Sequence, residues 1–140
     1  MISEFLTAFR FLTILPIPGR ASEKTTGLAR SMIFFPAVGF AISGISLGLF
    51  FLAKAVFPLH TAALVLLIAP VVASGGLHVD GFADFCDGFF GGRDKADILR
   101  IMKDSSIGVF GALGIIFLMI AKFECLKILA DQTVFFLMAI

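Results

Sequence analysis

Tryptophan and tyrosine are absent from the 140 residues, and charged side chains make up only 15% of them. The chain therefore lacks the Trp/Tyr belt that marks the membrane–water interface in many membrane proteins. A net charge of +1 excludes a bulk attraction to nucleic acid. Cys86 and Cys125 lack the spacing of a metal or redox motif, so a structural disulfide has no support. Arg10 breaks the apolar N-terminus and Pro16 and Pro18 follow it, which excludes a cleavable signal peptide.

Long apolar runs are present instead, in a chain that is 59% hydrophobic. Residues 31–53 carry no charge and are long enough to cross a hydrocarbon core of about 30 Å. Residues 61–77 form a second run near the lower length limit, and residues 107–121 form a third that reaches residue 130 if its charged side chains snorkel. Residues 5–18 predict an interfacial helix ending at Pro16, or a short re-entrant piece. We expect an all-α, polytopic integral membrane protein with about three to four transmembrane helices in this chain.

Two polar stretches, residues 16–30 and 78–106, carry most of the basic side chains. The positive-inside rule places both stretches in the cytoplasm, and the two apolar runs between them agree with that parity. We therefore expect a single membrane domain over residues 1–140, with residues 78–106 as a cytoplasmic active-site segment. Because residues 133–140 are again apolar, we interpret the chain as the N-terminal part of something longer or as a shortened relative.

The segment GGLHVDGFADFCDGFFGGRD, residues 75–94, concentrates acidic side chains. Asp80, Asp84 and Asp87 follow one another at i, i+4 and i+7, which places them on one face of a helix. Three neighbouring carboxylates call for a cation, and hard oxygen ligands suit Mg²⁺ rather than zinc. The alternative is that they are ordinary solvated loop residues. His78 is a candidate general base, a candidate metal ligand or a polar helix-end residue.

The stretch that follows is suited to phosphate. Gly91 and Gly92 are expected to end the first helix, and a second, amphipathic helix is expected to start near Asp94. Glycine backbone N–H groups and an arginine fork favour an anionic phosphate, with Arg93 and Lys103 as the candidate cations. The alternative for both cations is contact with anionic lipid headgroups.

The start of the third apolar run contains both polar residues and glycines. Asp104 or Ser105 is expected to cap the helix, and Asp104 is also a second candidate, with Asp94, for the acidic site. Gly108, Gly111 and Gly114 imitate a dinucleotide-binding pattern, but no strand precedes them. They are better interpreted as a close-packed helix face.

Four segments in this order resemble one known family: FLTAFRFLTILPIP, SMIFFPAVGF, the stretch from GGLHVDGFADFCDGFFGGRD to GVFGALG, and KFECL. Together they resemble cobalamin synthase, also called adenosylcobinamide-GDP ribazoletransferase. The resemblance runs from about Phe5 to about Leu126, and its central signature is H-x-D-G-x-A-D-x-x-D-G-x-x-G-G-R-D. Family members continue with further membrane helices.

The resemblance implies a multi-pass enzyme of the cell inner membrane in the last assembly stage of vitamin B12. It implies transfer between adenosylcobinamide-GDP and α-ribazole (or its 5′-phosphate), giving adenosylcobalamin (or its 5′-phosphate) and GMP, with Mg²⁺ as cofactor. On this reading Asp80, Asp84 and Asp87 hold the metal, while Arg93 and Lys103 with the Gly91–Gly92 backbone bind phosphate. His78 or one carboxylate accepts the proton. The partners implied are these substrates and the lipid bilayer, and the oligomeric state is open.

Three other classes remain as alternatives. A CDP-alcohol phosphotransferase also holds metal with aspartates on a membrane helix, but its D-G-x-x-A-R pattern is not matched after residues 80–84. A cation transporter would place its acids deep inside the apolar runs. A non-catalytic membrane fragment or assembly subunit is the third alternative.

Overall fold

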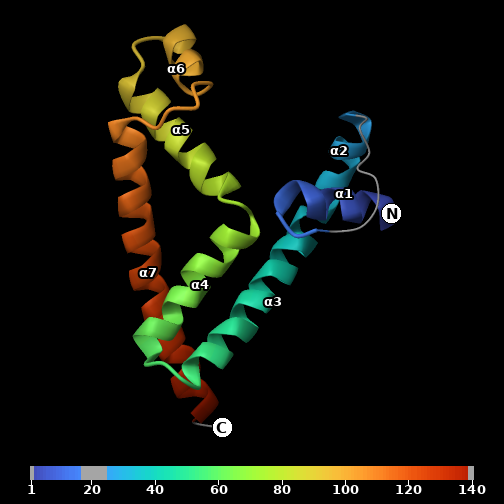
Figure 1. Cartoon of the computed structure of the whole chain (residues 1–140), viewed down its shortest axis with the longest axis vertical. Helices are drawn as coiled ribbons and strands as arrows, with labels where there is room; N and C mark the ends of the chain where they lie inside the picture. The colour runs from blue at the N-terminus through green and yellow to red at the C-terminus, as the bar shows by residue number, and fades with distance from the viewer. Residues whose placement is uncertain (1, 17–24, 139–140) are drawn as a thin grey trace. The chain divides into compact units, whose positions relative to one another are not determined.

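The computed structural model describes residues 2–16 and 25–138, and every regular element in those two ranges is a helix (Figure 1). The expected all-α class is confirmed. The chain divides into two compact units, Met1–Gly75 and Gly76–Ile140, and each is described here by itself.

The first unit begins with the amphipathic helix α1 (Ile2–Leu12). Its buried residues, Ala8 and Leu12, pack with Val38 of α3 (Phe35–Lys54) and are surrounded by phenylalanine rings. The helix ends at Leu12 rather than at the expected Pro16. A proline disfavours the helical conformation of the residue before it, so Pro16 restricts Leu15 and the helix ends earlier than Pro16.

A long apolar helical segment follows. Helix α2 (Thr25–Ser31), the 3₁₀ turn η1 (Met32–Phe34) and α3 run on without a break. Pro36 lies in the first turn of α3, where its missing N–H leaves no hydrogen bond unmade. Helix α3 packs against α4 (Leu59–Ala73), and the N–H of Ile14 donates to the carbonyl of Ala73 at 2.9 Å.

Two helical segments in the described ranges are long and apolar enough to cross a membrane, Gly27–Lys54 and Val109–Gln132. A third span is counted only if α4 and α5 (Leu77–Gly91) are taken together as one bent pair. The expected run over residues 61–77 is interrupted because Gly75 and Gly76 adopt φ of 61° and 78°. These left-handed conformations end α4 after 15 residues.

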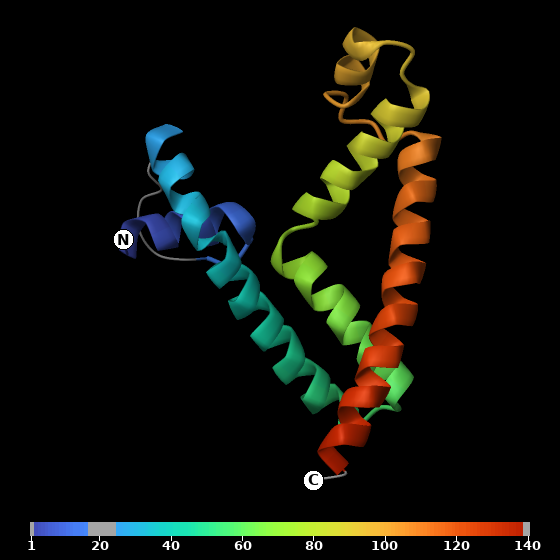
Figure 2. The same ribbon diagram turned by 180° about the vertical axis from the view of Figure 1, so that it is seen from behind.

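The second unit consists of α5, α6 (Lys95–Ile101) and α7 (Val109–Met138). Helices α5 and α7 lie close together where α5 ends and α7 begins, and they separate toward the start of α5 (Figures 1 and 2). Helix α6 packs on the last turns of α5. The third apolar run is a helix that continues past residue 130 to Met138.

Candidate functional site

Helix α5 carries His78 and the three aspartates that the sequence analysis assigned to the metal site, Asp80, Asp84 and Asp87. The helix begins at Leu77 after the two glycines, so His78 and Asp80 lie in its first turn. Both are exposed, and Asp84, one turn later, is half-buried. Asp87, near the other end of α5, is only 8% exposed. The three aspartates therefore lie in three different environments.

Asp87 faces the start of α7. One of its carboxylate oxygens, Oδ2, accepts a hydrogen bond from the N–H of Gly108 at 2.7 Å. The other, Oδ1, accepts one from the N–H of Gly111 at 2.8 Å. The first N–H groups of a helix have no partner within the helix itself, and an anion there is stabilised by the helix dipole. Asp87 thus supplies the cap of α7 from a distant part of the chain.

This cap differs from the expected one. Asp104 and Ser105 were the sequence candidates for capping α7, but the carboxylate of Asp104 accepts hydrogen bonds from the N–H and hydroxyl of Ser106, at 2.9 and 2.6 Å. The Ser106 donors hold the pKa of Asp104 below its ordinary value. Asp104 therefore accepts hydrogen bonds within its own turn, from Ser106, and the N–H groups at the start of α7 donate to Asp87 instead.

The glycines at the start of α7 lie against α5. A Cβ at Gly111 would collide with the Asp87 carboxylate, and a Cβ at Gly114 would approach the Sγ of Cys86 at 2.6 Å. Gly108 likewise faces Asp87. The interpretation of these residues as a close-packed helix face is confirmed.

No group of three or more His, Cys, Asp or Glu side chains within the described ranges is arranged to hold a metal ion. Asp80 and Asp84 lie one turn apart on α5, and no hydrogen bond or ion pair of either carboxylate is found in the described part of the chain. Asp87 lies one turn beyond Asp84, with both oxygens engaged by α7. The assignment of all three to one Mg²⁺ site stays a prediction.

The glycine pair ends α5 as expected. The helix stops at Gly91, and Gly92 adopts an extended conformation with φ −81° and ψ 143°. Asp94 then starts α6, because its side chain accepts the N–H of Asp97 at 2.9 Å. The structure therefore places Asp94 as a helix cap.

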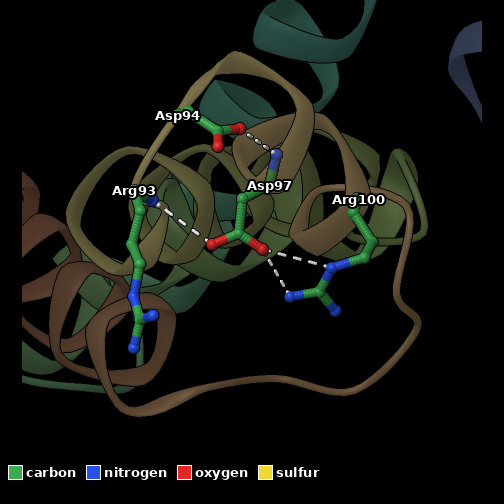
Figure 3. Close-up of polar contacts among 4 residues, drawn as sticks. All are labelled: Arg93, Asp94, Asp97 and Arg100. Atoms are coloured by element: carbon green, nitrogen blue, oxygen red, sulfur yellow. Dashed lines mark hydrogen bonds and ion pairs between the residues drawn. The ribbon is translucent and has the colours of Figure 1, made fainter.

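Asp97 organises this turn, and sequence reasoning missed it. Its carboxylate accepts the backbone N–H of Arg93 at 3.3 Å and the guanidinium of Arg100 at 2.6 and 3.2 Å (Figure 3). The Arg100 guanidinium holds the pKa of Asp97 below its ordinary value. The side chain of Arg93 extends away from Asp97 in Figure 3, so its guanidinium is not used in this network. The spacing of Asp94 and Asp97, an acid three residues after a capping acid, was the available sequence signal.

An open cavity of about 340 Å³ lies beside the hydrogen bonds that join Asp87 of α5 to the start of α7. It brings Asp87 and Gly91 of the predicted site together with Asp104, and its lining also includes Ile101, Ser106 and Phe110. The other candidates lie outside this lining: His78, Asp80, Asp84, Gly92, Arg93, Asp94 and Lys103. The predicted residues therefore do not form a single cluster: three of them line this cavity and the other seven do not.

Comparison with known proteins identifies the family to which this sequence is similar. The family model for cobalamin-5-phosphate synthase matches residues 4–140. Proteins named adenosylcobinamide-GDP ribazoletransferase are 46% identical over 132 residues in Chlorobaculum parvum, 45% over 117 residues in Chlorobium phaeobacteroides and 37% over 130 residues in Shewanella amazonensis. These alignments cover 93%, 84% and 93% of this chain.

The same alignments cover 50%, 46% and 50% of the three relatives, so the chain spans about half the length of the curated relatives it matches. No solved structure gives a significant match. The family model nevertheless covers nearly all of this chain, including α5, the loop after it and α7. The chain belongs to the cobalamin-5-phosphate synthase family.

Proposed function

We propose that this chain provides part or all of a membrane-bound transferase that joins adenosylcobinamide-GDP to α-ribazole (or its 5′-phosphate). The products are adenosylcobalamin (or its 5′-phosphate) and GMP. The family and the names of the relatives support this assignment. We also propose that the protein lies in the cytoplasmic (inner) membrane with residues 78–106 facing the cytoplasm, as the positive-inside rule indicates.

The reaction is a displacement at phosphorus. A free ribose hydroxyl of the ribazole, other than the 5′ one that carries phosphate in the alternative substrate and product, attacks the phosphorus next to the cobinamide. The bond from that phosphorus to the bridging oxygen of the pyrophosphate breaks. GMP leaves with the bonding electron pair, and the hydroxyl proton passes to a base. Such transition states spread negative charge over oxygens, so positioning and charge stabilisation supply most of the catalysis.

The observation that carries the proposal is the pair of neighbouring carboxylates on α5. Asp80 and Asp84 are one turn apart, one exposed and the other half-buried. Mg²⁺ in phosphate-transfer sites is commonly held by one or two carboxylates together with water and substrate phosphate, so this donor set fits the ion. A bound Mg²⁺ would neutralise charge on the pyrophosphate. Asp87, one turn further along the helix, has both carboxylate oxygens hydrogen-bonded to backbone N–H groups at the start of α7.

The loop after α5 is proposed to bind the phosphates. Arg93 and Lys103 are exposed at the two ends of the segment that contains α6. Guanidinium and ammonium groups there would neutralise the departing GMP, and the backbone of Gly91 and Gly92 lets a phosphate approach closely. His78, in the first turn of α5, or a carboxylate of the same helix would accept the hydroxyl proton.

The test is turnover by the purified protein in liposomes, with adenosylcobinamide-GDP and α-ribazole as substrates. We expect Mg²⁺-dependent release of GMP with matching formation of adenosylcobalamin. Asp84→Ala should abolish the release of GMP and the formation of adenosylcobalamin, because it removes a charged metal ligand next to the reacting phosphate. Membrane insertion should stay intact. Asp131→Asn is the matched control, since Asp131 is an exposed carboxylate on α7 outside this site.

Full activity of Asp84→Ala would contradict the assignment of the metal to α5. If the chain alone gives no product, the same assay is repeated after extending it with the C-terminal half of a relative. Activity that appears only in the extended protein would mean that the site needs helices beyond this chain. No product in either form would reject the proposed reaction.

A further inference from the structure

We infer that Asp87 is a positioning residue that fixes α5 to the start of α7, and not a ligand of the catalytic metal. The inference rests on the proposed function where it concerns turnover, but the contacts themselves are independent of it. Both carboxylate oxygens are used, since Oδ2 accepts the N–H of Gly108 and Oδ1 accepts that of Gly111. Gly108 and Gly111 follow Asp87 by 21 and 24 residues in the sequence. We call these two hydrogen bonds, which join α5 to the start of α7, the clamp.

Burial supports the clamp. Asp87 is 8% exposed, and a buried carboxylate is costly unless it is well hydrogen-bonded. Here the two N–H donors lie at the positive end of a 30-residue helix, which offsets the negative charge. All buried side-chain nitrogen and oxygen atoms in the described ranges have a hydrogen-bond partner. The charge of Asp87 therefore needs no cation to be stable where it is.

The donors are glycines for a steric reason. A Cβ added at Gly108 or at Gly111 would collide with the same Asp87 carboxylate, and at Gly111 it would also lie 2.9 Å from the carbonyl oxygen of Ala83. The clamp thus requires three residues together, one acid on α5 and two glycines at the start of α7. A freely hydrated metal ligand would not require this fit.

The clamp closes the loop that is proposed to bind phosphate. Residues 92–108 leave the end of α5, form α6 and return to the start of α7, so the two hydrogen bonds of Asp87 hold both ends of that loop together. Arg93 and Lys103 lie within it. Asp80 and Asp84, by contrast, are fixed relative to each other by α5 alone. Loss of the clamp should therefore misplace the phosphate-binding loop and leave a metal site on Asp80 and Asp84 intact.

The first experiment measures the clamp without any substrate. The protein is labelled with ¹⁵N-glycine, which gives signals from its 14 glycines, and amide hydrogen exchange is followed in micelles. We expect the amides of Gly108 and Gly111 to be protected in the wild type. Asp87→Asn retains the shape but offers one acceptor oxygen in place of two, so at least one of these amides should exchange about tenfold faster or more.

Two controls isolate the effect. The amide of Gly114 lies inside α7, and its exchange should not change in Asp87→Asn. Asp104→Asn makes the same chemical change in a carboxylate that accepts its hydrogen bonds from Ser106. It should leave the amides of Gly108 and Gly111 protected. Unprotected Gly108 and Gly111 amides in the wild type, or protection unaffected by Asp87→Asn, would overturn the clamp.

The second experiment separates positioning from metal binding. Turnover per folded protein is measured against Mg²⁺ concentration for the wild type, Asp87→Asn and Asp84→Asn, in the form of the protein that is active. Asp87→Asn should lower kcat while its half-saturating Mg²⁺ concentration stays within about twofold of the wild type, because the donors on Asp80 and Asp84 remain. Asp84→Asn should raise that concentration about tenfold or more, as loss of a charged ligand requires.

If Asp87→Asn raises the half-saturating Mg²⁺ concentration as much as Asp84→Asn does, then Asp87 binds the metal and the inference is overturned. Absence of turnover in every form would reject the proposed function only, since the amide exchange of Gly108 and Gly111 tests the clamp without substrate. The two failures are therefore distinguishable.

Discussion

Replacing Gly111 with alanine should destabilise the second unit, although alanine is the better helix former. The new Cβ would lie 2.9 Å from the Ala83 carbonyl oxygen and would collide with the Asp87 carboxylate. Overpacking of this kind costs about 1–3 kcal/mol. Displacing the carboxylate loses a charge-assisted hydrogen bond of about 1.5–3 kcal/mol. The gain in helix propensity is about 1 kcal/mol, which leaves a net loss of about 1.5–5 kcal/mol.

The assay is equilibrium unfolding of the purified protein in mixed micelles with increasing denaturing detergent. Gly81→Ala is the matched control, because it also replaces a helical glycine of this unit but a Cβ there meets nothing within 4 Å. That variant should be unchanged or more stable by up to about 1 kcal/mol. If Gly111→Ala is as stable as Gly81→Ala, then α5 and α7 do not pack as described and the clamp argument fails.

Two further predictions concern the same unit. Gly114→Cys, in a Cys125→Ser background, should form a disulfide with Cys86 on oxidation, because a Cβ at position 114 lies 3.3 Å from the Cβ of Cys86; a gel mobility unchanged by oxidant would contradict this helix pairing. Arg100→Gln should raise the pKa of Asp97 toward its ordinary 3.8, because the guanidinium lowers it in the wild type. A carboxyl group with a lowered pKa stabilises the folded state at pH values above its ordinary pKa, and this stabilisation is lost as the pH falls through the lowered pKa. Helix α6 of the variant should therefore lose order at a higher pH than α6 of the wild type. Carboxyl NMR titration measures the shift, and an unchanged Asp97 pKa would contradict it.

Local sequence signals predicted most of the helices. The apolar runs identified α3 and α7, because membrane helices are recognised by length and composition alone. The pair Gly91–Gly92 correctly ended α5, and Asp94 correctly began α6, since breaking and capping depend on neighbouring residues. The run over residues 61–77 was continuous in composition, but Gly75 and Gly76 adopt left-handed conformations that composition does not reveal.

The pairing of Asp87 with α7 could not be predicted from the sequence. Its partners are 21 and 24 residues away, and no local pattern specifies which carboxylate of α5 they meet. Helical periodicity placed Asp80, Asp84 and Asp87 on one face and so treated them as equivalent. They differ because α7 approaches only the later turns of α5 (Figures 1 and 2), which buries Asp87 and leaves Asp80 exposed.

The structure divides the aspartates of residues 78–106 by their hydrogen-bond partners. Four of the six accept hydrogen bonds from backbone N–H groups, from Arg100 or from Ser106; they are Asp87, Asp94, Asp97 and Asp104. Asp80 and Asp84 have no such partner within the described ranges. Like charges at i and i+4 destabilise a helix, so this pair lowers stability unless a cation joins it. Mg²⁺ commonly takes one or two carboxylates from a protein when substrate phosphate completes its coordination, and this pair meets that requirement. The functional hypothesis therefore depends on Asp80 and Asp84, and Asp87 contributes by holding the helix that carries them against α7.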